Sequence, residues 1–394
     1  MRRNASVTAI GRAWVCLVFW FGWSSGGLHG ADGKLEILSP TPDRVYQRTG
    51  YVPRESHEHQ PGGPRLGSAD VPVRIMLPAG GADAIEVQVQ DLVPPTDGRL
   101  AQSGQEWQEV KGTITGKEFS GSFTVPAGGW YRLGFRARKG EAEVGAGSVE
   151  RVGVGEVFLI AGQSYAEHAN DERLAVQDPQ GRVTLRELGS GSWRVAHDPE
   201  ENPDRGTIWP PFGDHLVSIL RVPVGFCNVA SGGTASRQWL PGTPLYERLV
   251  TQGKGLQRFR AVLWQQGESD VIESLPREEY VKRLQLIRES AAKEWGFEPT
   301  WLLAKSTLHP TVYNEPVKEG AIRGAIDDLW KLPGFGRGPD TDQLAGENRG
   351  GPMTRRHFSG VGQRRAGLMW FVAAMNEIER QAELPVVESP LTKP

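Results

Sequence analysis

The chain has 394 residues and a formal net charge of −2, so its length favours two domains of unequal size and its charge argues against a nucleic-acid partner. It contains two cysteines, Cys16 and Cys227. Cys16 lies in the N-terminal segment described next, which leaves Cys227 unpaired and excludes an internal disulfide or a cysteine-based metal site in the rest of the chain. Cys227 stands in an apolar run, which is typical of a core residue.

The first residues have the pattern of a secretory signal peptide. Arg2, Arg3 and Arg12 accompany an apolar run over residues 13–23, and small residues follow up to Ala31. Such a run is too short to span a bilayer comfortably, so we expect cleavage near Ala31 rather than a membrane anchor. Residues 1–31 therefore predict an exported protein, secreted or periplasmic, with no membrane span after cleavage.

Residues 32–153 predict a β-sandwich domain, because short alternating apolar stretches are separated by Gly, Pro and Asp without a long helical pattern. The clearest stretches are Val71–Met76, Ile85–Val89, Glu118–Val125 and Trp130–Ala137. The segment Arg48–Asp70 is rich in Pro, Gly and charge and indicates a long surface loop. His57 and His59 fall in it, where a solvated loop is favoured over a metal site.

Residues 154–382 show apolar runs that alternate with helical segments, which predicts βαβ units and a mostly parallel sheet. The predicted strands are Val157–Ile160, Val224–Val229, Ala261–Trp264 and Trp301–Ala304. Helical spacing predicts a helix over Arg277–Trp295. A last helix is expected after Ser359 as its N-cap, and residues 383–394 form a C-terminal tail. The predicted buried side of that helix consists of Leu368, Met369, Phe371, Val372 and Met375.

A serine follows the first of these strands, in Ala161-Gly162-Gln163-Ser164. Ligands bind at the carboxyl ends of strands in an open α/β sheet, and Gly162 allows a tight turn that projects Ser164, which makes this serine a candidate nucleophile. An ordinary turn would use the same residue types. Residues 162–166 also come close to the nucleophile elbow of an α/β-hydrolase, but that fold places several strands before its serine.

Two further predicted strands end in polar turns, Ser231-Gly232-Gly233-Thr234 and Gln265-Gln266-Gly267-Glu268. In a parallel sheet these turns and the serine turn gather at one edge. A serine hydroxyl needs a base to become a nucleophile. His357 is the best candidate, because an imidazole can take the serine proton and return it to the leaving alcohol near neutral pH.

Together, the Gly162-Gln163-Ser164 turn, the Gln266-Gly267-Glu268 turn and the late His357-Phe358-Ser359 segment resemble the sialate O-acetylesterase-like branch of the SGNH (GDSL-type) hydrolases, also called carbohydrate esterase family 6. The resemblance covers roughly residues 150–380 and implies a three-layer α/β/α domain with a mostly parallel sheet. It implies an acyl-enzyme mechanism with Ser164 and His357, and no metal or organic cofactor. By motif position it assigns the oxyanion donors to the backbone N–H of Ser164, a backbone N–H at Gly232 or Gly233, and the side-chain amide of Gln266.

The chain departs from this family pattern at two positions. Relatives carry Asn directly after the serine, where this chain has Tyr165, and Asp three residues before the histidine, where it has Thr354. A threonine hydroxyl can orient an imidazole, but it cannot stabilise imidazolium as a carboxylate does. The candidate replacement acids are Glu268, which is preferred because its turn lies at the predicted site, and Asp340 or Asp342.

Several other side chains are candidates for substrate contact, each with an ordinary structural alternative. For the arginines the alternative is a surface position, and for the histidines it is a hydrogen-bonded structural role. The candidates are Gln163, Tyr165, His168, Arg349 and Arg356, and His309 is weighed as a catalyst against a structural role.

These patterns predict a secreted serine esterase that removes acyl groups, with acetyl preferred, from a carbohydrate. The expected partner is the acylated carbohydrate, and the oligomeric state is not predicted. One alternative is an α/β-hydrolase such as a lipase. Another is a non-catalytic carbohydrate-binding or surface protein that kept the fold and lost its acid at Thr354. The N-terminal domain would orient the substrate or brace the catalytic domain, although a fold alone does not establish binding.

Overall fold

The computed structural model describes residues 33–53, 66–92, 106–200, 204–309, 315–351 and 356–382. The predicted signal peptide and C-terminal tail lie outside the described residues, as do His57, His59 and Thr354. Among the described residues, no helix has the length and apolar character needed to cross a bilayer. Within the same ranges, no three or more His, Cys, Asp or Glu side chains are grouped so that they could hold a metal ion.

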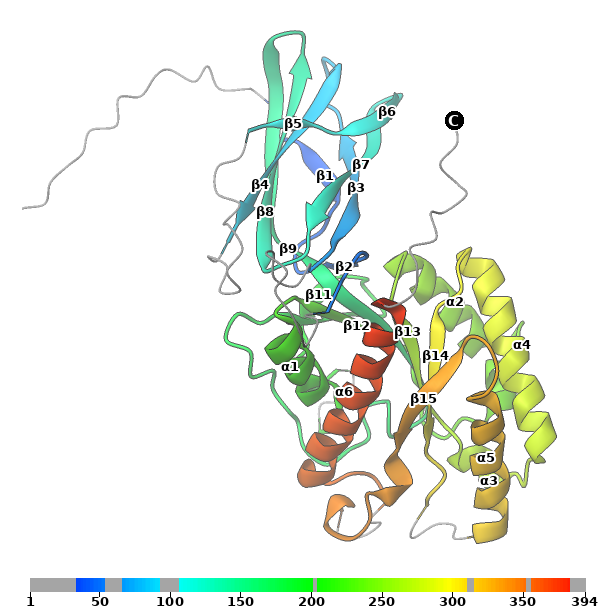
Figure 1. Cartoon of the computed structure of the whole chain (residues 1–394). Helices are drawn as coiled ribbons and strands as arrows, with labels where there is room; N and C mark the ends of the chain where they lie inside the picture. The colour runs from blue at the N-terminus through cyan, green and yellow to red at the C-terminus, as the bar shows by residue number, and fades with distance from the viewer. Residues whose placement is uncertain are drawn as a thin grey trace, which may run out of the picture.

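Antiparallel strands build the N-terminal part (Figure 1). One sheet has the order β1 (Glu36–Ser39), β3 (Ser68–Met76), β7 (Glu118–Pro126), β6 (Lys111–Thr115). A second set joins β5 (Gln108–Glu109), β4 (Ala84–Asp91), β8 (Trp130–Lys139) and β9 (Ala142–Gly162). The antiparallel sheet structure expected of this part is therefore present.

Alternation of side chains explains these strands. In β3, Val71, Val73 and Ile75 are fully buried, whereas the residues between them point away from the core. Phe123 of β7 meets Phe135 of β8 edge to face, with ring centroids 6.3 Å apart. The two sets of strands thus pack against each other through their apolar faces.

The strand β9 continues beyond the N-terminal part and becomes the central strand of the core sheet. The order of that sheet is β11 (Trp193–Val195), β10 (Val183–Arg186), β12 (Val224–Asn228), β9, β13 (Ala261–Gln265), β14 (Thr300–Lys305), β15 (Phe335–Asp340). Neighbours from β10 to β15 are parallel, and β11 is antiparallel to β10.

The prediction of a mostly parallel sheet is wrong for the sheet as a whole, which has 11 strands and is mixed. One unbroken strand is the reason, because β9 carries the antiparallel strands β8, β4 and β5 on its first half and parallel neighbours on its second. The short β2 (Val45–Gln47) also pairs with β9, in parallel. The predicted domain boundary at residues 153 and 154 falls inside β9.

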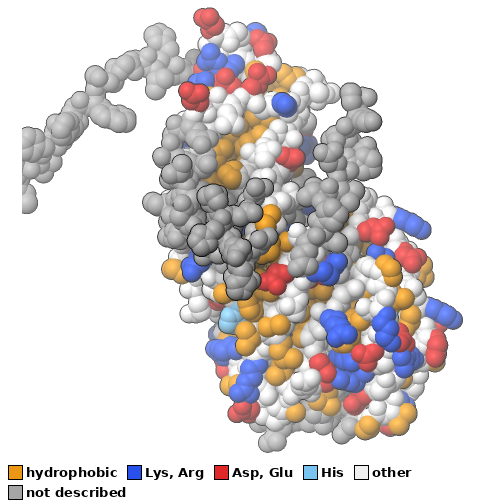
Figure 2. All heavy atoms as spheres, viewed as in Figure 1, with side chains coloured by type: hydrophobic (Ala, Val, Ile, Leu, Met, Phe, Trp, Pro, Cys, Tyr) orange, Lys and Arg blue, Asp and Glu red, His pale blue; other side chains and the backbone are white. Residues whose placement is uncertain are grey.

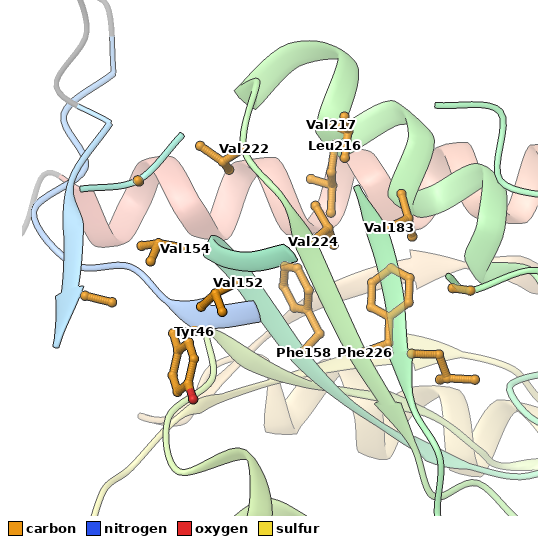
Figure 3. Close-up of a cluster of buried hydrophobic side chains, with 14 of the residues drawn as sticks. Tyr46, Val152, Val154, Phe158, Val183, Leu216, Val217, Val222, Val224 and Phe226 are labelled. Carbon is orange, nitrogen blue, oxygen red and sulfur yellow. The ribbon is translucent and has the colours of Figure 1, made fainter. Parts of the chain in front are cut away.

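Helices cover both faces of the core sheet (Figure 1). The first layer contains α1 (Trp209–Leu220) and α6 (Gly360–Ala382), and the second contains α2 (Pro244–Leu256), α3 (Glu268–Ile272), α4 (Arg277–Trp295) and α5 (Pro316–Leu329). Phe158 of β9 and Phe226 of β12 lie beside α1, as Figure 3 shows, whereas Val157 and Leu159 pack in the second layer. Burial on both faces explains why this half of β9 is continuously apolar.

Most predicted core elements are present. The helix over Arg277–Trp295 has the predicted bounds. Three of the four predicted strands fall within β9, β13 and β14, and Val224–Val229 extends one residue beyond β12. Cys227 is fully buried in β12, as predicted for a core residue. On the face seen in Figure 2, acidic and basic side chains of the described residues are interspersed, in line with the small net charge.

The last helix begins as predicted after Ser359, whose Oγ accepts a hydrogen bond from the N–H of Gly362 at 3.2 Å. Its predicted buried side is wrong for Leu368 and Val372, which are 45% and 50% exposed, whereas Met369, Phe371 and Met375 are half-buried and pack against the core. The helix instead buries Trp370 and a set of small residues, Gly362, Ala366, Gly367, Ala373 and Ala374. Close approach is the reason: a Cβ at Gly367 would lie 3.0 Å from the backbone nitrogen of Phe212 in α1.

A cluster of buried charged groups lies where β9 enters the core sheet. Glu156 is fully buried and accepts hydrogen bonds from Arg48 Nε (2.7 Å), Arg260 Nε (2.7 Å) and Gln47 Nε2 (3.0 Å). Burial alone would raise the pKa of Glu156, but the two arginines and the hydrogen bonds outweigh it and lower this pKa to about 2. The cluster ties the segment at β2 to the start of β13 through one carboxylate.

We expect Glu156→Gln to lower the free energy of unfolding by about 3–5 kcal/mol, because it leaves two guanidinium groups buried without a carboxylate. Urea denaturation at neutral pH measures this loss. The carboxylate of the wild-type protein stabilises the fold fully above about pH 4.5 and loses this effect as the pH falls toward about 2, so the difference between the two proteins should shrink over that range.

The matched control is Glu298→Gln, on a carboxylate that is 72% exposed and bound to Arg288. Exposed pairs contribute little to stability, so its urea midpoint should stay close to that of the wild type. Equal losses in the two variants would contradict a special role for the buried cluster.

Candidate active site

Ser164 lies on a turn directly after β9, at the carboxyl edge of the core sheet. Gly162 ends the strand with φ of +133°, and a Cβ at this position would lie 2.1 Å from the carbonyl oxygen of Gln265. Only glycine fits where β9 passes β13 so closely. The N–H of Ala166 closes the turn by donating to the Gln163 carbonyl at 2.9 Å, and Ser164 remains partly exposed.

The structure brings Ser164 and His357 together although 193 residues separate them, with Ser164 Oγ and His357 Nε2 2.9 Å apart. Asn170 joins the two segments. Its Oδ1 accepts from the N–H of Phe358 at 3.1 Å, and its Nδ2 donates to the Tyr165 carbonyl at 3.2 Å. Asn170 belongs to none of the motifs in the sequence, so its role becomes visible only in the fold.

The imidazole of His357 is held in its neutral form. Burial is the main reason why its pKa is lowered to about 4, and the nearby Arg356, His309, Arg205 and Arg349 lower it further. A neutral ring has one nitrogen with a lone pair, which a base needs in order to take the proton of a hydroxyl. His357 can therefore act as a base toward Ser164 at any pH well above 4.

Backbone N–H groups lie beside Ser164. A Cβ at Gly232 would lie 3.6 Å from Ser164 Cβ and 2.6 Å from Glu167 Oε2, which places the Gly232 backbone next to the serine. Gly233 follows with φ of +68° and no atom within 4 Å of its Cβ position. In the part of the chain that the structure describes, the N–H groups of Ser164 and Gly232 donate to no protein acceptor. Neither group is engaged by another acceptor in that part of the chain, which an oxyanion donor requires.

Gln266, predicted to donate its side-chain amide to the oxyanion, is engaged elsewhere. It is fully buried, and its Nε2 lies 3.1 Å from the Thr234 carbonyl oxygen and 3.3 Å from Gln163 Oε1, and also bonds the Asp270 carboxylate. Three acceptors already surround a group that has two hydrogens. The structure therefore corrects this prediction: Gln266 holds the three strand-end turns together.

Three predicted substrate contacts are buried, since Gln163, Tyr165 and Arg349 are only 1%, 1% and 7% exposed. Gln163 Oε1 accepts from the N–H of Ser269 at 3.2 Å, which links the serine turn to α3. Tyr165 lies against the ring of His357. Arg349 donates to the backbone carbonyls of Thr341, Leu344 and Arg356. All three side chains support the site from within, so the predictions of substrate contact are corrected.

Glu268, the preferred replacement acid, does not bond His357. Its Oε1 accepts from Ser306 Oγ at 2.7 Å, and its Oε2 has no partner among the described residues. Burial raises the pKa of this carboxyl to about 8, so it is largely protonated at neutral pH and cannot stabilise an imidazolium as a carboxylate would. The prediction is corrected because the loop after β14 holds Glu268 on Ser306.

Asp340 and Asp342 are also engaged elsewhere. Both bind Arg323, at 2.6 and 2.5 Å, and Asp342 further accepts from the N–H and the hydroxyl of Thr307. They brace the loop after β14 against α5 and form no hydrogen bond with His357. Within the described ranges, no residue is hydrogen-bonded to Nδ1 of His357.

His168 lines a cavity of about 260 Å³ at the carboxyl ends of β10 and β12, together with Glu167 and Asn228. Because Glu167 also touches the Gly232 position, this cavity lies next to the serine turn. His168 is thus near the site without contacting Ser164 in the described hydrogen bonds. A substrate group that fills the cavity would meet it.

Arg356 and His309 flank the histidine. Arg356 is half-buried and its Nε has no partner among the described residues, and the same holds for Nδ1 of the buried His309. Burial, then Arg356 and Arg349, lower the pKa of His309 to about 4. Both side chains add to an environment in which a second positive charge is unfavourable.

Part of the chain is similar to known proteins. Residues 154–301 match the family model described as carbohydrate esterase, sialic acid-specific acetylesterase. A probable carbohydrate esterase of Arabidopsis thaliana is 29% identical over 151 residues, and the match covers 32% of this chain and 58% of that protein. The chain thus spans little more than half the length of this relative.

Two solved structures resemble the chain. The crystal structure of a carbohydrate acetylesterase from Xanthomonas citri matches with 18% identity and a TM-score of 0.51, over 85% of this chain and 73% of that one. A protein from Arabidopsis thaliana matches with 20% identity and a TM-score of 0.47, over 56% of this chain and 98% of that one. The first likeness shows a shared fold, and with the family match it confirms the resemblance to these carbohydrate esterases that the three motifs predict.

We expect the imidazole of His357 to titrate near pH 4, well below the ordinary value of about 6.5, because burial and the nearby arginines disfavour its charged form. Ring resonances of labelled histidine, followed by NMR from about pH 3 to pH 8, measure the pKa, and His357→Gln assigns the signal. A His357 signal with its midpoint near 6.5 would contradict the buried, electropositive environment described above.

Proposed function

We propose that this protein is a serine esterase that removes acetyl groups from a carbohydrate through an acyl-enzyme on Ser164. The observation that carries this proposal is the 2.9 Å contact between Ser164 Oγ and His357 Nε2, on a partly exposed turn beside N–H groups that donate to no acceptor among the described residues. The acetylesterase family match over residues 154–301 supports the choice of reaction and substrate class. Secretion or periplasmic export is proposed from the sequence of residues 1–31 alone.

The proposed reaction has two steps. Nε2 of His357 takes the hydroxyl proton while Oγ of Ser164 forms a bond to the acetyl carbon, and the N–H groups of Ser164 and Gly232 bind the resulting oxyanion. The bond to the sugar oxygen then breaks, and His357 gives that oxygen the proton. In the second step a water gives a proton to the same imidazole and forms a bond to the acyl carbon. The bond from that carbon to Ser164 Oγ then breaks, His357 returns the proton to Oγ, and acetic acid leaves.

The N-terminal strands would act as a support in this proposal. We assign them to a β-sandwich that braces the catalytic part through the shared strand β9 and the buried Glu156 cluster. The substrate group would then be recognised at the carboxyl edge of the core sheet, near the cavity lined by His168.

A second candidate function is a non-catalytic carbohydrate-binding protein with a degenerate site. It draws on the finding that none of the predicted acids Glu268, Asp340 and Asp342 bonds His357. A folded wild-type protein that retains glycan binding and hydrolyses acetate esters no faster than Ser164→Ala would favour this alternative.

We expect Ser164→Ala and His357→Ala each to lower kcat for p-nitrophenyl acetate by at least about 10³-fold, because members of such a constellation act as a unit. Ser218→Ala, on an exposed serine of α1, is the matched control and should keep the wild-type rate. Initial rates and a circular dichroism spectrum of each variant provide the measurement. Wild-type turnover in Ser164→Ala would rule out the proposed nucleophile.

We expect Gly232→Ala to lower kcat by about 10- to 100-fold, because the new methyl would lie 2.6 Å from Glu167 Oε2, so either that side chain or the Gly232 backbone beside Ser164 must shift. The control is Gly233→Asn, since asparagine tolerates a positive φ and no atom lies near that Cβ position. Steady-state kinetics with the same ester compare them. Equal losses would show that the turn as a whole, rather than the position of Gly232, matters.

A further inference from the structure

Among the described residues, no carboxylate supports the base of this site as a triad acid would. Within the described residues, nothing is hydrogen-bonded to Nδ1 of His357, and the position directly after the nucleophile carries Tyr165 instead of the Asn of the family pattern. A base that moves protons must nevertheless be held within about 10–20° of its working orientation. Within the part of the chain that the structure describes, a different contact orients the ring.

Tyr165 makes that contact. It is 1% exposed, and its ring meets the His357 ring edge to face, with centroids 5.3 Å apart and an interplanar angle of 67°. Its hydroxyl is bonded to the carbonyl of Arg356, the residue directly before His357, and lies 3.1 Å from the carbonyl of Leu308. One side chain thus contacts both the imidazole and the backbone from which it projects.

A buried cation and a second aromatic ring fix Tyr165 in turn. The Arg349 guanidinium lies 4.9 Å from the centroid of the Tyr165 ring and 4.8 Å from that of Phe358, and the two rings are 4.8 Å apart. Arg349 also donates to the Arg356 carbonyl at 3.2 Å, the same acceptor that the Tyr165 hydroxyl uses. The phenol therefore has little freedom to leave the imidazole.

We infer that Tyr165 is the positioning residue for His357, and that it replaces the orienting part of a triad acid by ring packing and by its bond to the Arg356 carbonyl. This inference rests on the proposed esterase function. Burial raises the pKa of the Tyr165 hydroxyl far above neutral pH, so the phenol stays uncharged. It orients the base without stabilising the imidazolium, which distinguishes it from a carboxylate.

The test compares Tyr165→Phe, which removes only the hydroxyl, with Tyr165→Leu, which also removes the ring. With p-nitrophenyl acetate we expect kcat to fall about 10-fold in Tyr165→Phe and about 100-fold in Tyr165→Leu, because a misplaced base reacts more slowly. KM should stay within about twofold, since the buried side chain does not reach substrate. Tyr131→Phe, which removes a buried hydroxyl bond to the Pro126 carbonyl far from the site, should leave kcat unchanged.

A double-mutant cycle separates positioning from a general structural effect. In the His357→Ala background the Tyr165→Phe substitution should have no further effect on kcat, because a residue that acts through His357 has nothing left to position. The same fold loss in both backgrounds would overturn the inference, as would an unchanged kcat in Tyr165→Phe. Should Tyr165→Leu fail to fold, as judged by circular dichroism, the Tyr165→Phe cycle alone decides.

Ser164→Ala in the same assay distinguishes a failure of the proposed esterase function from a failure of the inference about Tyr165. If Ser164→Ala keeps the wild-type rate, the proposed esterase function has failed and the inference with it. If Ser164→Ala is inactive while Tyr165→Phe is unaffected, the function stands and only the inference is overturned.

Discussion

Backbone hydrogen bonds on both edges of β9 decide where the functional residues of this molecule lie. Between Glu156 and Gly162 the strand pairs with β12 on one side and β13 on the other. This register sets Ile160 opposite Asn228 and Gly162 opposite Gln265, so the three strands end at nearly the same level. The turns that carry Ser164, Gly232 and Gln266 consequently meet as a result of strand pairing, before any side chain contributes.

Hydrogen bonds between buried polar groups then fix the positions of these turns relative to one another. The Gln266 amide bonds to groups from the other two turns, and Asp270 accepts from both the N–H and the hydroxyl of Ser236 at 2.8 and 2.7 Å. Satisfied buried networks of this kind specify one arrangement, because any other would leave a polar group without a partner. The turn that carries Ser164 is therefore supported by a network of buried amides and carboxylates, which fixes its geometry.

The sequence predicts those features that depend on local pattern. An apolar run over Val157–Ile160 and helical spacing over Arg277–Trp295 report burial directly, and the order of the three motifs brings Ser164 and His357 into one hypothesis. The strand β15 has no such pattern. A Cβ at Gly338 would lie 2.6 Å from the Leu303 backbone, so glycine stands where an apolar residue would have indicated a strand. The partners of Gln266 and Glu268 depend on loops from distant parts of the chain, which a pattern of residue types does not encode.

The continuity of β9 has a consequence for how such a protein could arise. Separable modules are usually joined by flexible linkers that few contacts cross. Here the predicted junction at residues 153 and 154 lies inside one hydrogen-bonded strand, and Glu156, two residues later, is bonded to Arg48 from the N-terminal part and Arg260 from the core. A cut at that junction would break a paired strand and separate the Glu156 carboxylate from Arg48, so neither part would keep the buried ion cluster that lies between them.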